Sequence, residues 1–142
     1  MRHRKRYKKL GRYTEHRISM LKNLLKNLIK SPRLEIFTTL ARAKALQRFG
    51  SKVLTYAKKA AKIKNLINNA PEDQKEKLKT QLVNLSRKIY EYVGDRSLVK
   101  SAIDIGSMIN SKNKEKGGYL SIYRVGFRRG DAAIKALIRI EA

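Results

Sequence analysis

The chain has 142 residues, about the length of one domain, and the 42% of them that are apolar suffice for a core. Lys and Arg number 35 against 11 Asp and Glu, and the formal net charge of +24 predicts a permanent polyanionic partner, because a free chain would repel itself. The lack of cysteine excludes disulfides and Cys-ligated metal sites, and no apolar run approaches the roughly 20 residues that span a bilayer, so we expect no membrane association.

The segment of residues 1–13, MRHRKRYKKLGRY, is basic, contains no acid and shows no apolar periodicity. A like-charged block of this kind is normally disordered alone and works as a nucleic-acid-binding arm. No apolar stretch follows its basic residues, so it lacks the pattern of a secretory signal. We therefore predict a basic extended RNA-binding arm over 1–13 that precedes a single α+β domain over 14–142.

Apolar residues recur at helical spacing in the first half of the chain. The first helical pattern begins at Thr14, a predicted N-cap, and ends before Pro32, since the residue before proline is pushed out of the α region. A β-branched and aromatic stretch over 34–39 predicts a strand. A second helical pattern opens at Leu40 and runs past Gly50, a candidate bend, to the next proline.

Two further helices are predicted in the middle of the chain. Pro71 suits the first position of one of them, and Gly94 is its predicted stop. Asp95 is expected to cap a shorter helix that extends through Ile109.

A period of two replaces the helical spacing in residues 119–127 and 132–141, which a polar turn joins. One face of the second segment is wholly apolar: Ile134, Ala136, Ile138 and Ile140. This alternation indicates a half-buried strand, and the two segments together predict a C-terminal β-hairpin. The predicted fold class is therefore α+β, with several helices packed on a small sheet behind the basic arm.

Lys and Arg supply the phosphate contacts that dominate nucleic-acid binding, and they concentrate in the arm, along the first helix and in the later turn. The candidate RNA-binding residues in the arm and the turn are Arg2, Arg4, Lys5, Arg6, Lys8, Lys9, Arg12, Arg124, Arg128 and Arg129. Tyrosines lie among these cations and can stack on unpaired bases: Tyr7, Tyr13, Tyr119 and Tyr123.

Some of these signals have simpler interpretations. The cations Lys58, Lys59, Lys62 and Lys64 fit a plain solvated helix face equally well. Turn chemistry favours a purely conformational role for Gly130. Tyr123 shares a side with Val125 and Phe127, so its ring is alternatively a core residue.

Catalytic signals are weak, and we expect no enzyme, no metal site and no cofactor. The two histidines are His3 and His16, no cysteine accompanies them, and Asp131 fits a turn residue or an Arg partner better than a catalyst. An RNA-modifying enzyme would need a cofactor loop or convergent catalytic residues. The alternative is a DNA-binding architectural protein, which would need a helix–turn–helix or a dimer seam, and neither is evident.

Several segments resemble the bacterial ribosomal large-subunit protein seventeen family: MRHR, HRISMLKNLLKNLI and EIFTTLARAKALQRF, then GGYLSIYRVGFRRGDAA and ALIRIE. The resemblance implies a structural protein that binds large-subunit ribosomal RNA near the exit of the nascent-peptide tunnel. Its implied partners are that RNA and neighbouring large-subunit proteins, with no homo-oligomer, in cytoplasmic or alternatively organellar ribosomes. The implied RNA contacts are Arg2, His3, Arg4, Lys5, His16, Arg17, Lys44, Tyr119, Arg128 and Arg129.

Two departures from the family pattern affect the prediction. Ile134 stands where the family usually has Pro after GDAA, so a different local strand geometry is expected there. Residues 62–112 resemble the family poorly and form a longer middle, which we interpret as a lineage-specific helical extension.

Overall fold

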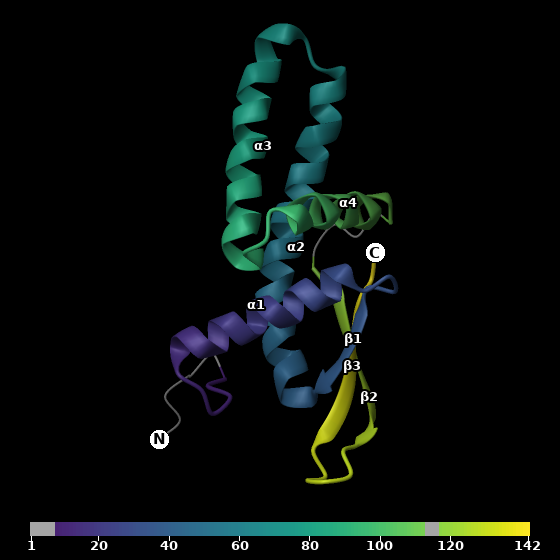
Figure 1. The fold of residues 1–142 in the computed structure, drawn as a ribbon. Helices are drawn as coiled ribbons and strands as arrows, with labels where there is room; N and C mark the ends of the chain where they lie inside the picture. The colour runs from purple at the N-terminus through teal and green to yellow at the C-terminus, as the bar shows by residue number, and fades with distance from the viewer. Residues whose placement is uncertain (1–7, 113–116) are drawn as a thin grey trace, which may run out of the picture.

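A computed structural model describes residues 8–112 and 117–142 (Figure 1). In this part of the chain the elements follow one another as α1 (Thr14–Lys30), β1 (Glu35–Thr39), α2 (Leu40–Asn69), α3 (Glu72–Val93), α4 (Ser97–Ser111), β2 (Leu120–Phe127) and β3 (Ile134–Ile140). Helices and a small antiparallel sheet with a C-terminal hairpin confirm the predicted α+β class. No helix of the described residues is long and apolar enough to cross a membrane.

The sheet has the strand order β1-β3-β2, with both pairs antiparallel. Strand β3 is central, and its Ile138 pairs with Ile36 on one side and Ile122 on the other. The predicted alternation is confirmed, because Ala136 and Ile138 are fully buried while Lys135 is exposed. The sheet therefore presents one apolar face to the helices.

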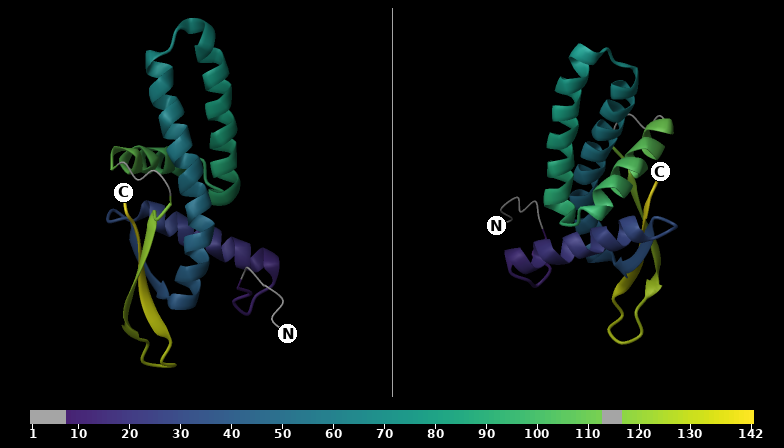
Figure 2. Two further views of the ribbon diagram at one scale, coloured as in Figure 1. Left: turned by 180° about the vertical axis from the view of Figure 1, so that it is seen from behind. Right: turned by 45° about the horizontal axis from the view of Figure 1, so that its top comes forward.

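Helix α2 is the axis of the molecule and contacts every other helix and all three strands (Figure 1). Its buried side consists of small and branched residues: Ala43, Leu46, Val53, Leu54, Ala57, Ala60 and Ala61. Its first half packs on the sheet, and its second half forms with α3 a helical hairpin that projects away from the sheet (Figure 2). Gly50 does not interrupt this helix; it lies against Leu25 and Leu120 in the core.

Helix α4 crosses α2 in direct backbone contact. A Cβ atom at Gly106 would lie 2.5 Å from the backbone carbon and oxygen of Ala57, so only glycine fits. One turn later, Nδ2 of Asn110 donates a hydrogen bond to the backbone oxygen of Lys58 (3.1 Å). The crossing is therefore fixed both by shape and by a hydrogen bond.

Lys58 does not lie on a solvated helix face, because only 8% of the residue is exposed. Its ammonium group lies 5.8 Å from the ring centroid of Tyr119, within the range of a cation–π interaction. Lys59, Lys62 and Lys64 are exposed, and Lys64 forms an ion pair with Asp104 on α4 (3.6 Å). Lys59, Lys62 and Lys64 therefore lie on an exposed helix face, whereas Lys58 is buried.

The starts of α1 and α3 lie one residue from their predicted places. Tyr13 occupies the N-cap of α1 and Thr14 is already helical, with no side-chain cap bond. Pro71 occupies the N-cap of α3 with an extended ψ of 156°, so the helix begins at Glu72. A difference of one residue is within the usual variation in where a helix end is assigned.

The predicted break between α3 and α4 is confirmed. Gly94 adopts the left-handed conformation (φ 70°) and donates its N–H to the oxygen of Tyr90. Oδ1 of Asp95 accepts hydrogen bonds from the hydroxyl and the N–H of Ser97, and the first of these is the main cause that lowers the pKa of Asp95. The N-cap of α4 is Arg96 and not Asp95 as predicted, but the Asp95 carboxylate still accepts the N–H of Ser97, the first residue of the helix.

We predict that Gly106→Ala lowers the free energy of unfolding by about 1–3 kcal/mol, because the added methyl group must push α4 away from α2. Urea unfolding followed by circular dichroism measures this change. Lys100→Ala, on an exposed position of the same helix, is the control and should change stability by less than about 0.5 kcal/mol. Equal stability of both variants would show that the two backbones do not touch.

Candidate nucleic-acid interface

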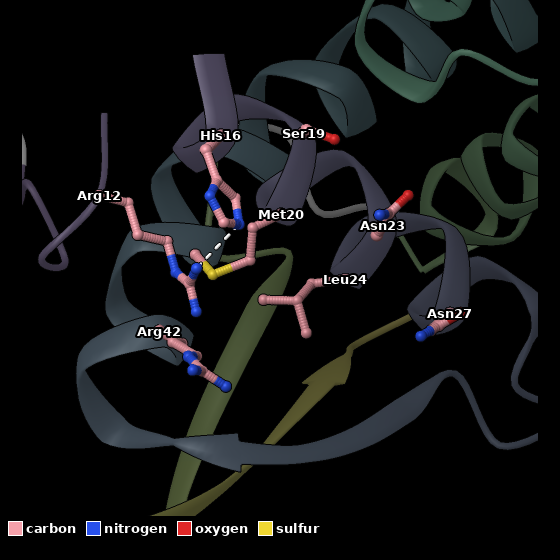
Figure 3. A pocket seen from close by; sticks show the side chains of 8 residues that line it. All are labelled: Arg12, His16, Ser19, Met20, Asn23, Leu24, Asn27 and Arg42. Atoms are coloured by element: carbon pink, nitrogen blue, oxygen red, sulfur yellow. Dashed lines mark hydrogen bonds between the residues drawn. The ribbon is translucent and has the colours of Figure 1, made fainter. Parts of the chain in front are cut away.

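A polar hollow lies between α1 and the start of α2 (Figure 3). Its wall on α1 arises from spacings of three or four residues, which place side chains on one helix face. Arg12 comes from the turn before α1, and Arg42 comes from the first turn of α2. The residues that line the hollow are Arg12, His16, Ser19, Met20, Asn23, Leu24, Asn27 and Arg42.

Two arginines reach this hollow, and a hydrogen bond holds one of them. Nη1 of Arg12 lies 2.8 Å from Nε2 of His16, and because a guanidinium has no acceptor, the arginine is the donor (Figure 3). Arg42 extends toward the same space from the N-terminal end of α2, where free N–H groups carry the positive end of the helix dipole. Asn23 and Asn27 add neutral donors beside them. Such a donor set can bind the oxygen atoms of a phosphate.

A second hollow adjoins the first and shares Arg12 with it. Lys9, Gly11, Arg12, Tyr13, Thr14 and Arg17 line it. The chain turns here through left-handed conformations at Leu10 and Gly11. Tyr13 is 91% exposed, so its ring is accessible among these cations. The described end of the basic segment therefore folds back on α1 and places an aromatic ring beside its arginines.

The turn between β2 and β3 forms the third basic region. Nε of Arg128 donates to Oδ1 of Asp131 (2.8 Å), and a second guanidinium nitrogen bonds the other carboxylate oxygen. Oδ1 of Asp131 also accepts the N–H of Ala133 (3.2 Å). The hydrogen bond from Arg128 is the main cause that lowers the pKa of Asp131 to about 2. This arrangement confirms Asp131 as a turn residue and an Arg partner.

The other candidate residues lie on several surfaces. Arg124 and Arg129 are exposed near the turn, Lys44 is exposed on α2, and Lys8 and Lys9 are exposed before α1. Arg17 is half-buried on α1. Arg2, His3, Arg4, Lys5, Arg6 and Tyr7 lie outside the described residues. The structure thus brings Arg12, His16 and Arg17 together at two adjoining hollows, whose lining residues do not include Lys44 or the hairpin turn.

Tyr119 does not lie where an RNA contact requires it. The residue is only 4% exposed and packs in the core under the ammonium group of Lys58. A ring in this position offers no free face to a base, so Tyr119 is corrected to a packing residue. Tyr123 shows the opposite result: it is 47% exposed, which excludes the core alternative.

The chain was compared with known proteins. Residues 20–141 match the model of the family described as ribosomal protein L17. The chain is 37% identical to the large ribosomal subunit protein bL17 of Thermotoga neapolitana, over 99% of this chain and 94% of the relative. It is 38% identical to the protein of the same name from Dictyoglomus thermophilum, over 99% of each chain.

This chain belongs to the ribosomal protein L17 family. It is therefore a structural component of the large ribosomal subunit and not an enzyme, as the sequence predicted. The matches with both relatives run through residues 62–112, so this middle is not peculiar to the present chain. In the described residues of this L17 protein, no group of three or more His, Cys, Asp or Glu could hold a metal ion.

Arg42, Asn23 and Asn27 are members of the site that sequence reasoning missed. The asparagines stand four residues apart and continue the spacing that begins at Arg12 and His16, a signal the sequence contained. Arg42 had no such signal, because only the packing of α2 against α1 brings it to the hollow.

We predict that the Arg128–Asp131 pair stabilises the hairpin in a pH-dependent manner. The folded pKa of Asp131, about 2, is below its ordinary value, so the stabilisation is present above about pH 4 and is lost as the pH falls toward 2. The melting temperature should therefore fall more steeply between pH 5 and pH 2 for the native chain than for Asp131→Asn. Parallel curves for the two proteins would contradict a native-state role of the pair.

Proposed function

We propose that this L17 protein binds and stabilises large-subunit ribosomal RNA, with the hollow of Arg12, His16 and Arg42 as a phosphate-binding site. The observation that carries the proposal is the convergence of these three side chains from a turn, α1 and α2 on one open surface. The net charge of +24 supports it, since phosphates would neutralise the excess.

The geometry favours recognition of the backbone of the nucleic acid. Phosphate contacts from arginines and helix N-termini fix the register and orientation of a protein on RNA without reading its sequence. The hollow offers these donors together with the amides of Asn23 and Asn27. Specificity would therefore come from the shape of the RNA around the domain, as is usual for structured RNA.

The proposed binding residues extend beyond the hollow. They comprise the arm over 1–13, with its described residues Lys8 and Lys9, and cations of α1, α2 and the hairpin turn: the half-buried Arg17 and the exposed Lys44, Arg124, Arg128 and Arg129. We also propose the arm positions Arg2, His3, Arg4, Lys5 and Arg6 as contacts. The charge pattern and the family resemblance of both end segments support these assignments.

We also propose where the protein lies in the ribosome. We infer a position near the exit of the nascent-peptide tunnel, next to neighbouring large-subunit proteins, on the resemblance carried by EIFTTLARAKALQRF and GGYLSIYRVGFRRGDAA. The relatives named above come from bacteria, which supports a cytoplasmic ribosome over the organellar alternative.

We predict that Arg12→Ala/Arg42→Ala weakens binding to transcribed large-subunit RNA about tenfold at moderate salt. The plot of log affinity against log salt should also lose roughly one unit of slope for each phosphate contact removed. A filter-binding series at several salt concentrations measures both quantities.

The matched control is Lys77→Ala/Lys79→Ala, which removes the same charge from exposed positions on α3. It should weaken binding far less, because it changes only the long-range field. Equal losses for both double variants would mean that the net charge, and not the hollow, holds the RNA.

A further inference from the structure

The outer face of the sheet carries a row of large apolar side chains. Phe37 on β1 and Tyr123 on β2 both pair with Leu137 on β3, so the three side chains lie across one face. Ala136 and Ile138, their neighbours along β3, point into the core and are fully buried. The row is therefore on the side of the sheet that faces away from α2.

This row is open to solvent. Phe37 is 68% exposed and Tyr123 is 47% exposed, whereas Leu137 between them is half-buried. The three strands lie side by side in Figure 1, with β3 in the middle. Since neighbouring strands are about 4.8 Å apart, the strands that carry the two rings lie roughly 10 Å apart. An exposed aromatic row of this kind marks a contact surface more often than plain solvated sheet.

The tyrosine of this row is held in place. Its hydroxyl donates to Oε1 of Glu141 (3.2 Å), and the guanidinium carbon of Arg139 lies 5.9 Å from its ring centroid. Arg139 in turn bonds Oε2 of Glu35 (2.8 Å from Nε). The ring therefore loses little conformational freedom when a flat ligand stacks on it.

The charges around the row indicate which partner fits. Two carboxylates and three cations surround the row: Arg139 bonds Glu35, Glu141 accepts the hydroxyl of Tyr123, and Lys135 and Arg129 are exposed on the same face and at the adjoining turn. A second copy of the chain would bring the same cations and a net charge of +24 against them. A polyanion that also carries flat aromatic groups complements both features, and RNA with unpaired bases has this chemistry.

We propose that the outer face of the sheet binds unpaired RNA bases, which stack on Phe37 and Tyr123. Leu137 forms the apolar floor between the two stacking positions, and Lys135 lies beside them to meet the phosphate backbone. This site rests on the proposed RNA-binding function and adds a second type of contact to it. The hollow beside α1 holds phosphates, whereas this face would read exposed bases.

The test compares two replacements of one ring. Phe37→Leu keeps an apolar side chain but removes the stacking surface, and Phe37→Tyr keeps the ring. Binding to transcribed large-subunit RNA should weaken about tenfold for Phe37→Leu with an unchanged salt slope, because no phosphate contact is lost. Phe37→Tyr should bind like the native chain. Thermal unfolding of both variants checks that the exposed position leaves the fold intact.

Two outcomes would overturn the stacking site. The first is native affinity for Phe37→Leu while Arg12→Ala/Arg42→Ala weakens binding, a result that leaves the phosphate site and the proposed function standing. The second is a crosslink to a neighbouring protein alone in purified large subunits that carry a photoreactive phenylalanine derivative at position 37, which would assign the face to that protein. A crosslink to ribosomal RNA in the same experiment supports the site. Absence of RNA binding by the native chain would remove the proposed function as well.

Discussion

The backbones of α2 and α4 touch at Gly106 and Ala57, and the arrangement of the other elements depends on this contact. The chain leaves α2, returns along α3, and must then pass across α2 at a depth that only a residue without Cβ allows. The end of α4 is thereby brought next to Lys58, to which Asn110 is hydrogen-bonded. From there the chain enters β2 with Tyr119 buried against the same lysine, so the crossing sets where the sheet meets the helices.

The elements were predictable from the sequence because their signals are local. The apolar alternation at Ile134–Ile140, the proline before α3 and the left-handed Gly94 each act within a few residues. Burial at single positions was not predictable in the same way. Lys58 lies among exposed lysines in the sequence, and its burial follows from α4 and Tyr119, which are distant along the chain. Arg42 reaches the hollow for the same non-local reason.

Three of the 11 acidic residues hold cations in place. Asp131 orients Arg128 at the hairpin turn, Glu35 holds Arg139 beside Tyr123, and Asp104 pairs with Lys64 between two helices. The Lys64–Asp104 and Arg128–Asp131 pairs are exposed and each stabilises the fold only modestly, whereas Glu35 in the third pair is 14% exposed. Their effect is to fix the directions of two guanidinium groups and one ammonium group on the surface. A protein that binds a folded polyanion gains from such order, because less side-chain entropy is lost on binding.

The length of α2 has a mechanical consequence. Its 30 residues form a continuous rod of about 45 Å, with the sheet packed at one end and the turn into α3 at the other. If the helix tilts by about 5° at the sheet, its far end moves by roughly 4 Å. The orientation in which the sheet end of the molecule is bound therefore determines which neighbours the turn between α2 and α3 can reach.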